Sequence, residues 1–153
     1  MDKVTTHWVF GWNLVFGTNG GGGTAESNVT EALRLASTGA ATFAASVVAE
    51  TDTDTSNTGS VTLDFTANQN FVLTLTGNVT LANPTTERVG ASGVIVCIQD
   101  GTGSRTLSLG SQFKTASGEG ITLSTGANDV DIIPYFVQAA DTILLGTVQK
   151  DFS

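Results

Sequence analysis

The sequence predicts an all-β protein: an antiparallel β-sandwich or jelly roll, preceded by an extended N-terminal anchor and a β-hairpin connector. Three observations lead to this prediction. After residue 58, short runs in which apolar and polar residues alternate fill the chain, as in half-buried strands. Gly, Asn, Asp and Pro separate these runs at the spacing typical of sandwiches and jelly rolls. A glycine tetrad, Gly20–Gly23, separates an aromatic N-terminal stretch from the rest.

The stretch that organises the chain is Ser92–Gly110. Its first part, Val94–Ile98, is continuously apolar, which predicts a strand covered on both faces. After turn residues at 100–103, Leu107 and Leu109 alternate with polar neighbours, which predicts a strand with one face in the core. We therefore expect a hairpin with a long loop, around which the other strands are arranged.

The N-terminal stretch, residues 5–17, has the alternation of one continuous strand. Its large apolar side chains fall at every second position and hence on one face: Trp8, Phe10, Trp12, Leu14 and Phe16. One interpretation is a first strand of the same core. The other is an anchor that docks on another protein, since such a stripe exposed on a monomer would aggregate. The glycine tetrad favours the anchor because Gly-rich linkers uncouple what they join, so we assign residues 1–25 to an anchor strand and linker.

Residues 26–58 are predicted to be a connector. Over residues 28–37 a short helix competes with a strand, because Asn28 resembles a helix cap with Glu31 three residues later. The hairpin interpretation is favoured, with Leu33 and Leu35 on one strand and Phe43 and Val47 on the other. A lone hairpin is marginally stable in water, so we expect these four residues to make oligomer contacts. The polar segment 50–57 is predicted to be a solvated linker.

Residues 59–153 are predicted to form the β-sandwich domain. Alternating or apolar runs that are bounded by turn residues predict its strands. Besides the pair in Ser92–Gly110, these are residues 61–65, 71–76, 79–81, 121–123, 130–138 and 142–148.

Composition limits the classes of function. The 153 residues include 6 basic and 14 acidic ones, a net charge of −8, so a phosphate backbone is not an expected partner. A charged fraction of 13% is low for a fully wetted monomer, which favours surface shared between subunits. No apolar run approaches the ~20 residues of a membrane helix, and no signal peptide is recognisable, so we expect a soluble product. The one cysteine, Cys97, lies in the most apolar run and is interpreted as core filler.

Enzymatic chemistry is not predicted, and no catalytic, cofactor-binding or metal-binding residue is assigned. His7 is the only histidine, and no cluster of His and Cys offers a metal site. Asp129 and Asp131 alternate with apolar residues, as on the solvent face of a strand. The polar loops 100–105 and 115–120 suit contact with a glycan as well as with solvent.

Several segments carry a resemblance to a known family. Ala32–Val48 resembles the connector of tail-fibre proteins of tailed bacteriophages, and Gly59–Ser153 resembles their small C-terminal β-domain. The most telling pieces are Ser60–Phe65, Leu75–Leu81, Ser92–Val96 and Asp100–Leu107. The resemblance implies a homotrimer that is fixed to other virion proteins, of the capsid or the tail, through its N-terminus.

The resemblance also implies a non-enzymatic structural protein of the virion, made in the host cytoplasm. The chain is shorter than a shafted fibre, so two hypotheses stay open. The first is a short trimeric fibre or spike that displays its β-domain for host-surface contact, with a host-surface glycan as the candidate ligand. The second is a capsid decoration protein that stabilises the head shell.

Overall fold

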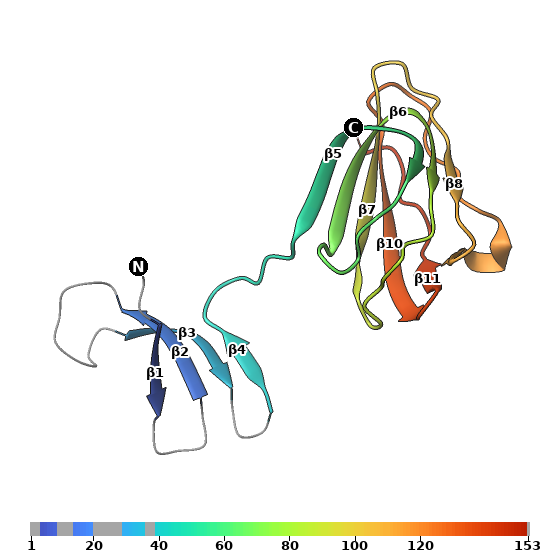
Figure 1. Ribbon diagram of the computed structural model, residues 1–153. Coiled ribbons are helices and arrows are strands. Elements are labelled where there is room, and N and C mark those ends of the chain that lie inside the picture. The colour runs from blue at the N-terminus through green and yellow to red at the C-terminus, as the bar shows by residue number, and fades with distance from the viewer. Residues whose placement is uncertain (1–3, 9–13, 20–28, 36–38, 153) are drawn as a thin grey trace. The chain divides into compact units, whose positions relative to one another are not determined.

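The computed structural model describes residues 4–8, 14–19, 29–35 and 39–152. The chain divides into two compact units, Met1–Val48 and Ala49–Ser153, both drawn in Figure 1. Nearly every element is a strand, which confirms the all-β prediction. In the part of the chain that is described, the one helical element is a short 3-10 turn, Ala116–Gly118.

The first unit is a four-stranded antiparallel sheet with its strands in chain order. The strands are β1 (Val4–Trp8), β2 (Leu14–Asn19), β3 (Val29–Leu35) and β4 (Ala41–Phe43). The single strand expected over residues 5–17 is wrong, because Trp8 and Leu14 are partners in two adjacent antiparallel strands. An alternation of period two is the same in one long strand and in two strands joined by a short reversal.

Residues 29–35 form a strand rather than the alternative helix, and this strand is part of a hairpin whose second strand ends at Phe43, before Val47. Strands β3 and β4 pair antiparallel, with Leu33 opposite Phe43 and Leu35 opposite Ala41. Gly39 supplies the left-handed backbone between them at φ 84°, a conformation that glycine adopts without steric cost.

The second unit is a curled, mixed sheet of seven strands (Figure 1). They are β5 (Thr51–Val61), β6 (Asn70–Leu81), β7 (Ser92–Gln99), β8 (Leu107–Leu109), β9 (Phe113–Lys114), β10 (Val130–Ala139) and β11 (Thr142–Leu145). Their order is β5-β6-β7-β10-β11-β9, and β8 pairs with β6. The long strand β6 changes partner along one edge, since Phe71–Leu75 pairs with β7 and Val79–Leu81 with β8.

The hairpin expected at Ser92–Gly110 is wrong, because β7 and β8 both pair with β6 rather than with each other. Strand β7 is central as expected, with β6 parallel on one side and β10 antiparallel on the other. Parallel pairs also join β5 to β6 and β9 to β11, so the sheet is mixed rather than antiparallel throughout. Turn residues at 100–103 indicate that the chain reverses, but they do not specify with which strand the following segment pairs.

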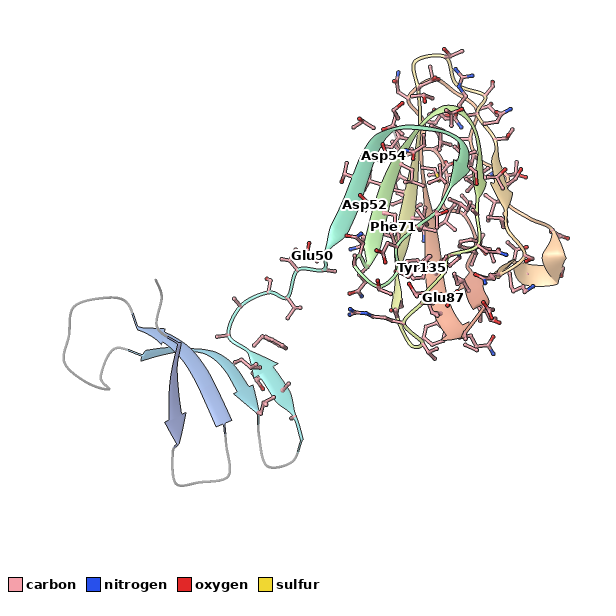
Figure 2. The ribbon with its side chains drawn as sticks, viewed as in Figure 1. Glu50, Asp52, Asp54, Phe71, Glu87 and Tyr135 are labelled. Carbon is pink, nitrogen blue, oxygen red and sulfur yellow. The ribbon has the colours of Figure 1, made fainter. Side chains whose placement is uncertain are left out.

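The solvated linker expected at residues 50–57 is also wrong, because Thr51 begins the edge strand β5. Asp52 and Asp54 lie exposed along it (Figure 2). Asn57 is 2% exposed, and its amide Nδ2 donates to the carbonyl oxygens of Asp54 at 3.1 Å and Thr74 at 3.2 Å. An edge strand whose side chains mostly face water needs no apolar alternation, and charges on it discourage pairing with other edges.

The core fills one face of the sheet. Its buried hydrophobic side chains are Leu63, Phe65, Phe71, Leu73, Leu75, Val79, Leu81, Ile95, Cys97, Leu107, Phe113, Leu123, Ile133, Tyr135, Val137, Ile143 and Leu145. Leu63 and Phe65 reach it from the loop after β5, not from the strand expected at 61–65. The ring of Phe65 meets the rings of Phe71 and Tyr135 edge-on, each at a centroid distance of 5.0 Å.

Strand β7 is covered on one face only. Ile95 and Cys97 are 0% and 2% exposed, whereas Val94, Val96 and Ile98 on the opposite face stay partly exposed. The expectation of a strand covered on two sides is therefore wrong for the chain as described.

Candidate functional site

A tight reversal between β8 and β9 forms one wall of a hollow in the second unit. Gly110 donates its N–H to the carbonyl oxygen of Leu81 at 2.7 Å. A Cβ at Gly110 would lie 2.3 Å from Oδ1 and 2.9 Å from the backbone nitrogen of Asn83, so a larger residue does not fit without a shift. The Asn83 side chain then holds the turn, since Nδ2 donates to Ser111 Oγ and Oδ1 accepts the Gln112 N–H.

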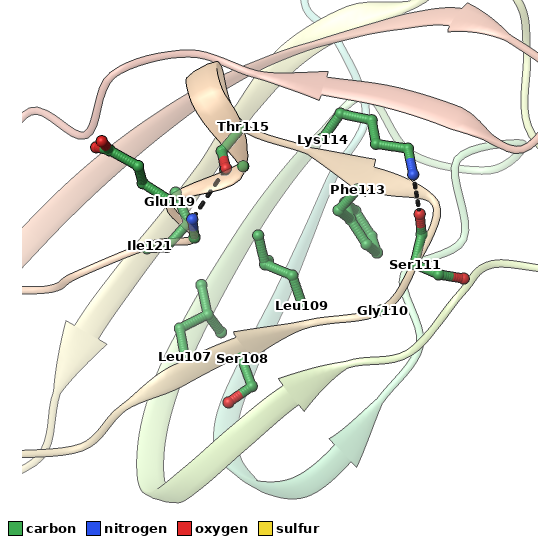
Figure 3. Close-up of a pocket in the computed structure, with 12 residues that line it drawn as sticks. Leu107, Ser108, Leu109, Gly110, Ser111, Phe113, Lys114, Thr115, Glu119 and Ile121 are labelled. Carbon is green, nitrogen blue, oxygen red and sulfur yellow. Dashed lines mark hydrogen bonds between the residues drawn. The ribbon is translucent and has the colours of Figure 1, made fainter.

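The loop that follows β9 forms the second wall. Ser117, Gly118 and Gly120 have left-handed backbone, with φ of 56°, 72° and 76°. Thr115 Oγ1 accepts the N–H of Gly120 at 3.0 Å and closes the loop on itself (Figure 3). Gly and Ser are residue types that are common in turns, and Gly adopts left-handed backbone without steric cost.

Between the two walls lies a hollow of about 580 Å³, here called the 107–121 pocket. The apolar residues that line it are Leu107, Leu109, Phe113 and Ile121, and the polar ones are Ser108, Ser111, Lys114, Thr115 and Glu119. Figure 3 shows Glu119 and Lys114 on opposite sides of it. A second hollow of about 260 Å³ shares Thr115, Glu119 and Ile121 with the first and adds Thr147 and Lys150.

The lining of the pocket combines groups that can contact a polar ligand. Hydroxyls, one carboxylate and one ammonium group beside apolar side chains can accept and donate hydrogen bonds to a polyhydroxylated ligand.

The two polar loops named from the sequence have different roles. Loop 115–120 lines the pocket, whereas the polar groups of loop 100–105 serve the fold. The Asp100 carboxylate accepts from the N–H groups of Thr102 and Gly103, each at 2.9 Å, and forms an ion pair with Arg105 at 2.7 Å. The hydrogen bond from Arg105, followed by those backbone bonds, lowers the pKa of Asp100 below its usual value.

Other ionisable groups of the second unit are also structural. Burial raises the pKa of the Cys97 thiol to about 12, with a smaller contribution from Asp131. The hydrogen bond from the Thr66 hydroxyl, with two backbone bonds, lowers the pKa of Asp64. No group of three His, Cys, Asp or Glu that could hold a metal ion occurs among the described residues. No helix in those ranges is long and apolar enough to cross a membrane.

The residues predicted to anchor the protein lie in the first unit or outside the described ranges. Trp8 ends β1, and Leu14 and Phe16 belong to β2. Phe10, Trp12 and the glycine tetrad are outside the described residues.

The residues predicted to make oligomer contacts come together only in part. Leu33 and Phe43 are cross-strand partners, whereas Val47 follows β4. Leu35, Phe43 and Val47 are 39%, 52% and 70% exposed.

Sequence reasoning missed most of the pocket. It identified loop 115–120 by its polar composition, but it placed Leu107 and Leu109 in a hairpin strand and did not join them to Phe113 and Ile121. The only available signal was Gly110, whose role depends on a contact with Asn83 far away in the chain.

Comparison with known proteins identifies the class. Residues 55–138, from the middle of β5 to the end of β10, match the family described as "Putative phage tail fibre C-terminal domain". This match spans more than half of the chain, so the protein belongs to that family of phage tail fibre C-terminal domains. It is accordingly a structural component of a phage tail and hence of the virion. No curated protein and no solved structure gives a significant match.

Proposed function

We propose that this protein is a short trimeric tail fibre or spike, attached through its N-terminal segment, whose β-domain contacts the host surface. The observation that carries the proposal is the family match over residues 55–138, which covers the β-domain that holds the 107–121 pocket. A tail component with an open, partly polar pocket in its C-terminal domain is equipped to bind a surface ligand.

The ligand class that suits the pocket is a glycan of the bacterial surface. Ser111 and Thr115 contribute hydroxyl-bearing residues to a lining that also holds apolar side chains, while Lys114 and Glu119 supply one charge of each sign. Sugars present hydroxyls on their edges and C–H groups on their faces, so a mixed lining of this kind serves both.

The first unit supports self-association and attachment. Leu35, Phe43 and Val47 are exposed apolar side chains on and beside a small hairpin, which favours contact with other copies. Residues 1–25 contain both tryptophans of the chain and retain their assignment as the attachment segment. Non-enzymatic function is supported by the family. The capsid-decoration alternative has less support, because the matching family is one of tail fibres.

The host-contact proposal is tested with the fluorescently labelled full chain on cells of the strain that the phage infects. We expect saturable binding that purified surface polysaccharide of that strain competes away. Glu119→Arg should weaken binding at least tenfold, whereas Asp52→Arg, the same charge change on the edge strand β5, should not. Absence of specific binding, or equal loss in both variants, contradicts host contact through this pocket. Gold labelling on the virion separately tests the position, and labelling of the head would contradict a tail fibre.

The trimer is tested by light scattering at micromolar concentration, where we expect three times the chain mass of 15.7 kDa. Phe43→Asp should lower that mass, because a charge would replace an exposed apolar contact of β4. A monomeric wild type would contradict the trimer.

A further inference from the structure

The face of the second sheet opposite the core is apolar across four strands, as follows from the register. Val72 of β6, Val96 of β7 and Ile132 of β10 are partners in one row. Val94 and Pro134 form the next row, and Phe136 of β10 lies opposite Leu144 of β11. Since successive side chains of a strand point to opposite faces, these residues share one side and the core residues share the other. We call this set, with Ile98 and Val130, the outer face.

Within the described chain the outer face is open. Phe136 and Leu144 are 45% and 39% exposed, and Val72, Val94, Val96, Ile98, Val130, Ile132 and Pro134 are partly exposed. None of these seven packs against the core cluster. A shallow hollow of about 300 Å³ opens beside Pro134, Phe136 and Leu144.

The charge pattern indicates what covers this face. The chain carries a net charge of −8, yet the rows of β6, β7 and β10 that hold Val72, Val94 and Ile98 contain no acidic or basic residue, and the one charged neighbour in the register is Lys114 of β9, opposite Leu144 at the edge of the face. A cationic partner would be selected by acidic side chains, which this surface does not present. Copies of one acidic chain repel each other unless the surfaces that meet are uncharged, and the outer face fulfils that condition.

The area indicates how much this contact contributes. Four strands ~4.8 Å apart and seven residues at ~3.3 Å each give a face of roughly 20 by 20 Å, or about 400 Å². This falls within the range of the largest apolar patch of a monomer, which is often functional. It is about half of the ~800 Å² per partner of a standard interface, so a second contact is needed for a stable assembly.

We propose that the outer face is a self-association surface, which the three β-domains of the assembly turn toward one another around their common axis. The proposal rests on the trimer of the proposed function for the number of copies and adds the surface that they share. The exposed apolar residues of the first unit supply the remaining contact area. Both surfaces are then required for a stable assembly.

Three single variants of the full chain test this surface by light scattering from 1 to 50 µM. Phe136→Asp and Val96→Asp place a charge on the outer face, and Thr80→Asp places one at an exposed position of β6 outside it. Circular dichroism selects the variants that are folded. We expect Phe136→Asp to be a folded monomer whose association constant falls at least 100-fold, because each assembled copy would bury a charge. Thr80→Asp should keep the mass of the wild type.

A folded Phe136→Asp or Val96→Asp protein that keeps the wild-type mass overturns the proposal. Because Phe136 is almost half exposed, its replacement should fold even if Val96→Asp does not. If Phe43→Asp dissociates and Phe136→Asp does not, the outer face is wrong while the proposed trimer stands. A monomeric wild type overturns both, whereas the binding to host cells is judged by its own experiment.

Discussion

The buried carboxylate of Asp131 offers the sharpest test of how the β-domain is held together. Asp131 is 1% exposed on the core side of β10, so the solvent-face position expected for it from the sequence is wrong. Its Oδ2 accepts the N–H of Ser124 at 2.6 Å, and its Oδ1 accepts the Ser124 hydroxyl at 2.8 Å and the N–H of Asp151 at 3.0 Å. One side chain thus connects β10 to the loop before it and to the C-terminal segment.

Asp131→Asn keeps the size of the side chain but turns one acceptor into a donor. In either orientation the new amide NH₂ faces an N–H group, of Ser124 or of Asp151, and leaves a buried donor without a partner. That costs about 1–3 kcal/mol, and the loss of charge assistance at the other bonds adds roughly 1 kcal/mol. We therefore expect a loss of about 2–4 kcal/mol from a typical total of ~5–15 kcal/mol.

Thermal unfolding followed by far-ultraviolet circular dichroism measures the effect. At about 4–8 °C per kcal/mol for a domain of this size, the Tm should fall by roughly 10–25 °C. Asp52→Asn is the matched control, because Asp52 lies exposed on β5 and its replacement should change the Tm by no more than a few degrees. Equal melting temperatures of the wild type and Asp131→Asn would refute the assignment of Asp131 as a buried link.

Three further predictions concern the same domain. Cys97, with its pKa raised to about 12 by burial, should react with a thiol reagent at pH 8 only as fast as the native protein opens. Fast labelling would contradict its placement. The pKa of Asp100 and of Asp64 is lowered from 3.8 by hydrogen bonds, so the unfolded chain takes up their protons first. Stability should be fully present above about pH 3.8 and fall as the pH drops below it, with a smaller fall in Asp100→Asn. Phe65→Ala should lower stability by about 3–5 kcal/mol in urea unfolding, against little change for the exposed Phe152→Ala.

The local alternation of apolar and polar residues was enough to predict the fold class, as β6 shows. Strand β6 alternates buried Phe71, Leu73 and Leu75 with less buried neighbours, which is the periodicity expected from its sequence. The connector hairpin followed from the same signal on both sides of Gly39. In each case the information lies within a few residues of the strand concerned.

Pairing could not be predicted, because it depends on contacts between distant residues. Asn57 is buried, and its amide donates hydrogen bonds to the carbonyl oxygens of Asp54 and Thr74. No local pattern in this Thr-rich, acidic segment indicates those contacts. The outer face was mistaken for buried sheet for a related reason. An apolar run such as Val94–Ile98 is the same whether its second face is covered by its own chain or by another copy.

The anchor gives a prediction in which the two interpretations of the N-terminus have opposite outcomes. Three large aromatic side chains, Trp8, Phe10 and Trp12, can each bury roughly 150–250 Å², on the order of 10 kcal/mol of gross apolar transfer at ~25 cal/mol per Å². Association and ordering costs remove much of this, but a trimer presents the segment three times. If the segment docks on the virion, replacing Trp8 and Trp12 by Ala should leave the melting of the free protein unchanged and yield particles that lack it. If these residues instead stabilise the folded chain, the double variant melts early and still assembles, and the anchor assignment is wrong.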